Sequence, residues 1–309
     1  MYTDTEIQAI DLFCGAGGLT NGLKKSGIDV VLGVDSDPSC IYPFQMNNDV
    51  KFKQKNIEEV SGKELKSNWN EGSFRLLAGC APCQPFSTYS QSSKKGEHSQ
   101  WSLLDSFSRL ISESMPDLVT MENVPGLIKR EVFHDFVDNI RSIGFYVTYK
   151  IVNCADYGVP QCRHRLVLLA SRLGTIGLIA PTHKPNDYRT VRDEIFSLTP
   201  LEAGESDEKD PLHIASSLSA KNMKRMIASQ PGGTWRDWRE ELITACHKKE
   251  TGNTYPSVYG RMRWDEPAPT ITTQFYGFGN GRFGHPEQHR ALSLREGAIL
   301  QTFPRWYRF

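Results

Sequence analysis

This sequence of 309 residues lacks the marks of a membrane or secreted protein. No apolar run approaches the roughly 20 residues that a membrane span needs, and residues 1–8 are too polar and acidic for a signal peptide. The cysteines number seven, an odd count without a regular framework, which fits a reducing cytosol. We therefore predict a cytoplasmic protein that does not enter a membrane.

The sequence also lacks net charge, because 36 Lys and Arg balance 36 Asp and Glu. The balance is not local. Residues 211–309 carry 14 basic against 8 acidic side chains, whereas residues 1–210 carry 22 against 28. A basic C-terminal third suggests one face meant for a polyanion, although uneven surface charge explains it nearly as well.

Internal repeats are absent, and strand-like and helix-like segments alternate as far as residue 170. This alternation predicts an α/β fold with a doubly wound, mostly parallel sheet. Strands are expected at 7–13, 30–34, 50–53, 74–78, 117–121, 146–152 and 166–170, and helices at 19–26, 101–114 and 132–143. Beyond about residue 175 the pattern gives way to Gly, Trp, Arg and Tyr, which predicts a second, small and irregular domain; helical spacing returns at 292–301.

A glycine-rich turn, Cys14-Gly15-Ala16-Gly17-Gly18, joins the first expected strand to the first helix. Glycines at such a turn let the backbone approach a ligand, and an acid about twenty residues later, here Asp35, can hold ribose hydroxyls. Asn56 and Ile57 could close the adenine end of such a pocket. The spacing suggests an adenosine-type cofactor, and the departure from G-x-G-x-x-G argues mildly against NAD.

A cysteine-containing stretch, Gly-Cys-Ala-Pro-Cys-Gln-Pro-Phe-Ser at 79–87, follows a buried strand. A cysteine held there by two prolines, at the edge where open α/β sheets bind ligands, is a candidate nucleophile. Three other interpretations compete: a C-x-x-C redox pair, a zinc site, and cysteine as a small apolar filler. A redox pair would not explain the glycine turn, and zinc lacks a second matched pair of ligands, so no metal is expected.

Two further features lie near the same predicted sheet edge. Residues 88–100 are polar and without apolar periodicity, which is typical of a linker or of a lid that closes over a site. Arg163 and Arg165 lie two apart on an expected extended stretch, so both should point to one face, although a surface pair of arginines would have the same spacing.

These pieces, in this order, resemble the DNA (cytosine-5)-methyltransferases best known from bacterial restriction–modification systems, over nearly the whole chain. The resemblance rests on five motifs: Asp11-Leu12-Phe13-Cys14-Gly15-Ala16-Gly17-Gly18, Pro82-Cys83-Gln84, Glu122-Asn123-Val124, Gln161-Cys162-Arg163-His164-Arg165, and Arg290 to Glu296 with Leu300 to Pro304.

The resemblance implies a transfer of a methyl group from S-adenosyl-L-methionine (AdoMet) to carbon 5 of a cytosine in double-stranded DNA. It implies that the Cys83 thiolate attacks carbon 6 and that a protonated Glu122 meets ring nitrogen 3. Arg165 would hold the carbonyl of the base, and Arg163 would lie near the DNA backbone or the closed loop. Since the chemistry cannot reach a base inside a duplex, the cytosine must be flipped out.

The resemblance also implies an AdoMet site and its residues. Asp35 and Asn56 depart from the family's usual Glu and Asp, which would weaken binding rather than abolish it. The expected cofactor-binding residues are Phe13, Gly15, Ala16, Gly17, Gly18, Leu19, Asp35, Ser36, Asn56, Ile57, Pro82 and Leu103.

We expect an AdoMet-binding catalytic domain at 1–178, a target-recognition domain at 179–289, and a segment at 290–309 that returns to the catalytic domain. The family's last motif, a Gly-Asn-x-Val-like helix, should follow Phe309 and is not in this sequence. Either the sequence is cut short, another chain supplies the motif, or the protein is impaired. A monomer is expected, and a cognate restriction endonuclease is a candidate partner.

Three alternatives remain open. One is a tRNA cytosine-5 methyltransferase, although the Cys-Phe-Thr signature of that branch is not found here. Another is a catalytically impaired DNA-binding relic, and the last is a thiol oxidoreductase.

Overall fold

The structure, a computed structural model, describes residues 6–82, 101–249, 252 and 255–309. Cys83, Gln84 and the expected lid at 88–100 lie outside the described residues. The chain divides into two compact units. Unit 1 contains the residues up to Val152, His164–Ala180 and Tyr307–Phe309; unit 2 contains Asn153–Arg163 and Pro181–Trp306.

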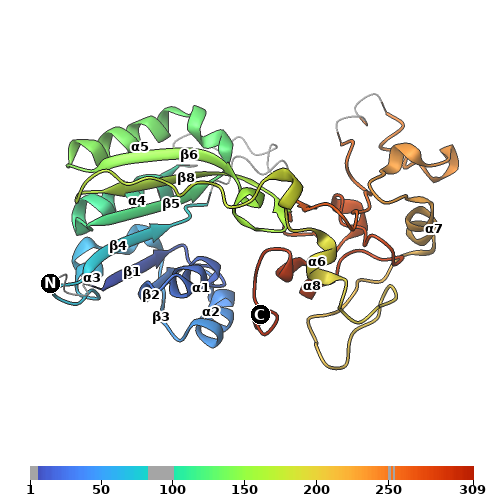
Figure 1. The fold of residues 1–309 in the computed structure, drawn as a ribbon, viewed down its shortest axis with the longest axis horizontal. Helices are drawn as coiled ribbons and strands as arrows, with labels where there is room; N and C mark the ends of the chain where they lie inside the picture. The colour runs from blue at the N-terminus through green and yellow to red at the C-terminus, as the bar shows by residue number, and fades with distance from the viewer. Residues whose placement is uncertain (1–5, 83–100, 250–251, 253–254) are drawn as a thin grey trace. The chain divides into compact units, whose positions relative to one another are not determined.

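Unit 1 is built on a seven-stranded sheet with the strand order β3-β2-β1-β4-β5-β8-β6 (Figure 1). The pairs β1–β2, β1–β4, β2–β3 and β4–β5 are parallel, and β8 runs antiparallel to β5. The strands are β1 (Ile7–Leu12), β2 (Asp29–Asp35), β3 (Lys51–Gln54), β4 (Phe74–Gly79), β5 (Leu118–Asn123), β6 (Tyr146–Asn153) and β8 (His164–Ser171).

Helices cover both faces of this sheet. Successive side chains of a strand point to opposite sides, and here both sides carry apolar residues that a helix layer buries. In β1, Ile10 belongs to the larger apolar cluster, and its neighbour Ala9 belongs to a second cluster on the other face. The helices of this unit are α1 (Gly18–Lys25), α2 (Ile41–Asn48), α3 (Gly62–Lys66), α4 (Ser102–Ser114) and α5 (Glu131–Ser142). The predicted doubly wound, mostly parallel sheet is confirmed.

The helices on the larger cluster have their apolar residues at helical spacing. In α4, Phe107, Leu110 and Ile111 are fully buried, and α5 buries Phe133 and Ile140 in the same cluster. Phe133 packs edge-on against Tyr149 of β6, with ring centroids 5.0 Å apart, where α5 lies along the sheet in Figure 1. This core fixes the strand ends on which the candidate site is built.

Unit 2 has short regular elements joined by long irregular segments. They are β7 (Gln161–Cys162) paired with β9 (Ala268–Pro269), and the helices α6 (Val191–Ile195), α7 (Ala220–Ala228) and α8 (Leu294–Ile299). Its apolar residues form two clusters, one around Val191 and Leu292, the other around Met226 and the adjacent rings of Trp238 and Tyr259, which are tilted by 60° to each other. The expectation of an irregular region after residue 175 agrees with this description.

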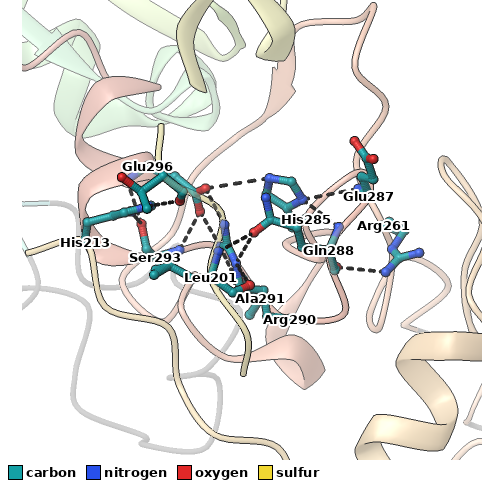
Figure 2. A network of polar contacts seen from close by, with 11 residues as sticks. Leu201, His213, Arg261, His285, Glu287, Gln288, Arg290, Ala291, Ser293 and Glu296 are labelled. Carbon is teal, nitrogen blue, oxygen red and sulfur yellow. Dashed lines mark hydrogen bonds and ion pairs between the residues drawn. The ribbon is translucent and has the colours of Figure 1, made fainter. Parts of the chain in front are cut away.

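A buried polar network holds the late segment of unit 2 together (Figure 2). Arg290 donates two hydrogen bonds to Glu296, both 2.7 Å, and both side chains are about 1% exposed. Burial alone would raise the pKa of Glu296, but the hydrogen bonds and charge of Arg290 outweigh it and lower that pKa. Ser293 caps α8 through the Glu296 N–H and also contacts His213 Nδ1 at 2.8 Å.

The two compact units divide the chain differently from the expected domains in two places. Asn153–Arg163, expected in the catalytic domain, group with unit 2, and of the expected returning segment 290–309 only Tyr307–Phe309 group with unit 1. Contacts within unit 2 hold the rest of that segment, because Arg290 donates to the Leu201 oxygen and Arg295 pairs with Asp210. The predicted functional boundaries remain a prediction.

Candidate active site

The candidate site lies along one edge of the unit 1 sheet, where four parallel strands end. Leu12 at the end of β1 is paired with Val34 of β2 and with Gly79 of β4, and Gly79 is paired with Met121 of β5. This register brings the residues that follow each strand to a common edge, which is where open α/β sheets bind ligands.

The first strand ends in a turn with unusual backbone angles. Phe13, Gly15 and Gly17 have φ values of +59°, +51° and +87°, so three residues of five adopt left-handed conformations. Such a turn directs successive backbone N–H groups to one side, which suits an anionic or polar ligand. A Cβ built on Gly15 would meet no atom within 4 Å, so the turn leaves open space in front of it.

The carboxylate of Asp35 ties the second strand to this turn. Its Oδ2 accepts a hydrogen bond from the Gly15 N–H at 2.9 Å, and its Oδ1 accepts one from the Asp37 N–H at 3.0 Å. Each carboxylate oxygen can accept a second bond, so these contacts leave room for a ribose hydroxyl. The structure therefore brings Asp35 and the glycine turn together, as the spacing predicted.

Asp11 is a feature that the sequence reasoning did not single out. Its Oδ2 accepts a hydrogen bond from the Thr20 hydroxyl at 2.7 Å, while its buried Oδ1 has no partner among the described residues. Burial raises the pKa of Asp11 to about 7. The signal was an acid in the strand Ile7–Leu12, which is apolar apart from Gln8 and Asp11, three residues before Cys14 of the glycine turn.

Asn56 and Ile57 open a 3-10 helix, Ile57–Glu59, after β3. The Asn56 Oδ1 accepts the Glu58 N–H at 3.1 Å, and Ile57 is buried in the core that Leu103 also contacts. Arg109 of α4 donates to the backbone oxygens of Ile57 and Glu58, which fixes this segment against α4. Asn56 thus acts as a helix cap and retains acceptor capacity for a second donor.

The segment that leads to Cys83 is held at its start. Cys80, Ala81 and Pro82 follow β4, and Asn123 at the end of β5 donates from Nδ2 to the Ala81 oxygen at 3.0 Å. Asn123 Oδ1 in turn accepts the Val124 N–H at 2.8 Å. Burial, and then the neighbouring Glu122, raise the pKa of the Cys80 thiol, which fits the apolar-filler interpretation of that cysteine.

The structure brings Glu122 and Arg165 together. The two lie on the antiparallel neighbours β5 and β8, and Arg165 Nε is 2.5 Å from Glu122 Oε1. Glu122 is 37% exposed and Arg165 14% exposed, so the pair lies at the surface of the strand edge rather than in the core.

Arg163 belongs to unit 2, unlike Arg165. Its guanidinium donates to the Ile271 oxygen at 3.3 Å, and the buried Gln161 bonds both Ile271 and Leu300. Gln161 and Arg163 therefore help to hold unit 2 together. Strand β7 ends at Cys162 and β8 begins at His164, so Arg163 lies between two strands and Arg165 lies in the second. The expectation that both arginines point to one face of a single extended stretch therefore does not apply.

Among the residues that the structure describes, no group of three or more His, Cys, Asp or Glu side chains is arranged to hold a metal ion. Within the same residues, no helix has the length and apolar character needed to cross a bilayer.

Comparison with known proteins gives consistent results. The family model described as C-5 cytosine-specific DNA methylase matches residues 7–309. The chain is 54% identical over 303 residues to the Type II methylase M.HgiDII of Herpetosiphon aurantiacus, covering 97% of this chain and 85% of that protein. It is 29% identical to the Type II methyltransferase M1.BsuMI of Bacillus subtilis, covering 99% and 74%.

The fold has a counterpart among solved structures. A candidate DNA modification methyltransferase encoded within a prophage of E. coli superimposes with a TM-score of 0.73 at 22% identity, over 98% of this chain and 90% of that chain. At this identity the likeness concerns the fold alone.

Proposed function

Since this chain belongs to the C-5 cytosine-specific DNA methylases and is a DNA cytosine-5 methyltransferase of the type II kind, we propose how its residues carry the reaction. The single observation that carries the proposal is the meeting, at one sheet edge, of the Asp35-bound glycine turn, the start of the Cys83 segment and the Glu122–Arg165 pair. The substrate is a cytosine in double-stranded DNA.

The residues at the ends of β1 and β2 fit AdoMet as the cofactor. The left-handed turn supplies backbone N–H groups and open space at Gly15, and Asp35 supplies acceptors for ribose hydroxyls. Asn56 and Ile57 would hold the adenine, with Phe13 beside it, and Leu103 and Pro82 would line the pocket. When bound, AdoMet supplies an electrophilic methyl group.

Cys83 is the proposed nucleophile. Its thiolate adds to carbon 6 of the cytosine, and the electron pair of the 5,6 double bond then makes carbon 5 nucleophilic. After carbon 5 is methylated, loss of its proton to water and departure of the sulfur restore the ring and the thiolate. Asn123 supports this role by fixing Ala81, two residues before the nucleophile, to the end of β5.

Glu122 and Arg165 are proposed to hold the ring. To donate a hydrogen bond to ring nitrogen 3, Glu122 must be protonated on one oxygen, and its other oxygen can still accept from Arg165 Nε, as Oε1 does in the structure. The remaining N–H groups of the guanidinium can donate to the carbonyl oxygen of the base. Each partner of the pair therefore offers one donor to the ring.

The base must leave the duplex to reach these residues, at a cost of roughly a few kcal/mol. Unit 2 supplies the arginines for phosphate and groove contacts, both Arg163 and those of the basic stretch 211–309 up to Arg305. We further propose that the protein acts as a monomer and works beside a cognate restriction endonuclease.

The proposal is tested by methyl transfer from labelled AdoMet to unmethylated genomic DNA, with the labelled nucleoside identified after digestion. The full chain should yield 5-methylcytosine, and Cys83→Ala should abolish the label. Glu122→Gln should lower the rate about 10²- to 10⁴-fold, the usual contribution of a positioned proton donor. Cys246→Ala, at an exposed cysteine of unit 2, is the matched control. Label on DNA from Cys83→Ala would reject the covalent mechanism.

A further inference from the structure

Tyr307, Arg308 and Phe309 belong to unit 1, and Tyr307 contacts the turn at 13–17. The Tyr307 side chain is fully buried, and its hydroxyl donates to the Ala16 backbone oxygen at 2.6 Å. Burial raises the pKa of Tyr307, so the phenol stays protonated and keeps this donor at neutral pH. Ala16 lies between the two glycines of the turn whose φ values are positive.

Helix α2 connects Tyr307 to the turn from a second side. Asn48 is buried, and its Nδ2 donates to the Tyr307 hydroxyl at 3.1 Å and to the Phe44 oxygen at 2.9 Å. A Cβ on Gly17 would lie 2.3 Å from Asn48 Nδ2 and 3.0 Å from the Tyr307 hydroxyl. Only glycine fits at position 17, both because of this contact and because of its positive φ.

The neighbouring residue of α2 anchors the backbone of the tail. Asn47 Oδ1 accepts the Arg308 N–H at 2.8 Å, and Asn47 Nδ2 donates to the Arg308 oxygen at 2.7 Å. The side-chain amide of Asn47 thus pairs with both backbone polar groups of Arg308. It sets the place of Tyr307 relative to α2 independently of the phenol itself.

Within the turn, the Gly17 N–H donates to the Cys14 oxygen at 2.9 Å, and the turn's other hydrogen bonds come from neighbouring segments. Gly17 is the N-cap of α1 and provides no side chain to bond the first N–H groups of the helix. Phe13 is held at a positive φ, which costs a residue with a Cβ on the order of 1–2 kcal/mol. Three hydrogen bonds from outside add to this support: the Val34 oxygen accepts the Cys14 N–H, Asp35 accepts the Gly15 N–H, and Tyr307 donates to the Ala16 oxygen.

We propose that Tyr307 is a positioning residue that holds the turn at 13–17 in the conformation that binds AdoMet, with Asn47 and Asn48 as its anchors. This inference rests on the proposed role of the turn as the cofactor site. Without the phenol hydroxyl, the Ala16 oxygen and one Asn48 N–H lose their buried partner, and the turn spends part of its time in other conformations. The apparent affinity for AdoMet then falls in proportion to the fraction of molecules whose turn keeps the binding conformation.

Two measurements on the full-length protein test this. Calorimetric titration gives the Kd of AdoMet for wild type, Tyr307→Phe and Asn47→Ala. The matched control is Tyr42→Phe, which removes the hydroxyl of an exposed tyrosine in α2, the helix that contains Asn47. Hydrogen exchange of the cofactor-free proteins reports the amides of residues 13–21. We expect Kd to rise about tenfold in Tyr307→Phe and less in Asn47→Ala, with faster exchange confined to residues 13–21 and 41–48. The control should match wild type.

The outcomes separate this inference from the proposed function. Should Tyr307→Phe bind AdoMet with the Kd of wild type, the positioning role is overturned. Faster exchange throughout the core strands would show a general loss of stability and would overturn it as well. Should wild type itself bind no AdoMet, the proposed cofactor role fails, and unchanged exchange at 13–21 in Tyr307→Phe would then overturn the inference on its own.

Discussion

The two units treat buried charge in opposite ways. In unit 1, Asp11 lies in the central strand β1 with one oxygen bonded to Thr20 and the other without a described partner. In unit 2, Glu296 is fully paired with Arg290 and with the backbone of its own helix start. A regular sheet with a large apolar core can tolerate a costly carboxyl next to its site, whereas an irregular chain depends on satisfied polar groups to fix its shape.

The difference gives the units opposite responses to pH. The pKa of Asp11 is raised from 3.8 to about 7 by burial, so its contribution to stability is present below pH 4 and is lost as pH rises toward 7. In unit 2, burial lowers the pKa of His285 from 6.5 to about 3. The stability linked to His285 is present above pH 6.5 and is lost as pH falls toward 3.

Breaking the paired charge should have the largest effect. Glu296→Gln leaves the buried Arg290 without its counter-charge, and we expect about 3–5 kcal/mol less stability of unit 2. Urea unfolding followed by tryptophan fluorescence measures this, because unit 2 contains Trp235, Trp238, Trp264 and Trp306. The double change Arg290→Met with Glu296→Leu should recover much of the loss, and no recovery would argue against the charge explanation.

Removing the unpaired charge should have a smaller effect of the opposite sign. Asp11→Asn cannot ionise, so the fall of roughly 3 kcal/mol in unit 1 stability expected between pH 5 and pH 8 should flatten. Thermal unfolding followed by circular dichroism across this pH range measures the slope. An unchanged slope in Asp11→Asn would mean that another group controls it.

Removing the cap of α8 should cost less again. In Ser293→Ala the Glu296 N–H and His213 lose the hydroxyl they contact, and we expect about 1–2 kcal/mol from unit 2. The same urea titration is suitable, with Ser197→Ala as a comparison at a serine that bonds Arg305 near the surface. Equal losses of stability in Ser293→Ala and Ser197→Ala would show that the cap contributes no more than a surface hydrogen bond.

The smallest effect is expected at an exposed pair of unit 2. Arg192 and Asp265 are joined at 2.7 Å but are 43% and 78% exposed, so Asp265→Asn should leave the unfolding midpoint of unit 2 unchanged within error. A shift comparable to that of Glu296→Gln would remove the distinction between buried and exposed pairs.

Much of unit 1 could be predicted from the sequence, because alternation and apolar runs directly report burial. The strand expected at 74–78 is Phe74–Gly79 in the structure, and the helix expected at 101–114 is Ser102–Ser114. Helix α2 was missed, since Pro43 lies inside it and Tyr42 and Met46 are exposed, so its apolar residues follow no single face.

The candidate site was predictable in part for the same reason. Motif residues placed Asp35 beside the glycine turn, and Glu122 beside Arg165, because each follows or lies on a strand whose neighbours the topology sets. The contact between Tyr307 and Ala16 joins positions 291 residues apart, and no local pattern encodes it. The unpaired oxygen of Asp11 likewise follows from packing rather than from spacing.

The covalent step at Cys83 is the center of the account, and one measurement tests it most directly. Duplex DNA in which one strand carries 5-fluorocytosine at every cytosine is incubated with the protein and AdoMet, and the products are analysed by mass spectrometry. Because fluorine cannot leave carbon 5 as a proton does, the account predicts a stable protein–DNA adduct on the peptide that contains Cys83, and none with Cys83→Ala. An enzyme that methylates ordinary cytosine in the same duplex yet forms no adduct at Cys83 would contradict it.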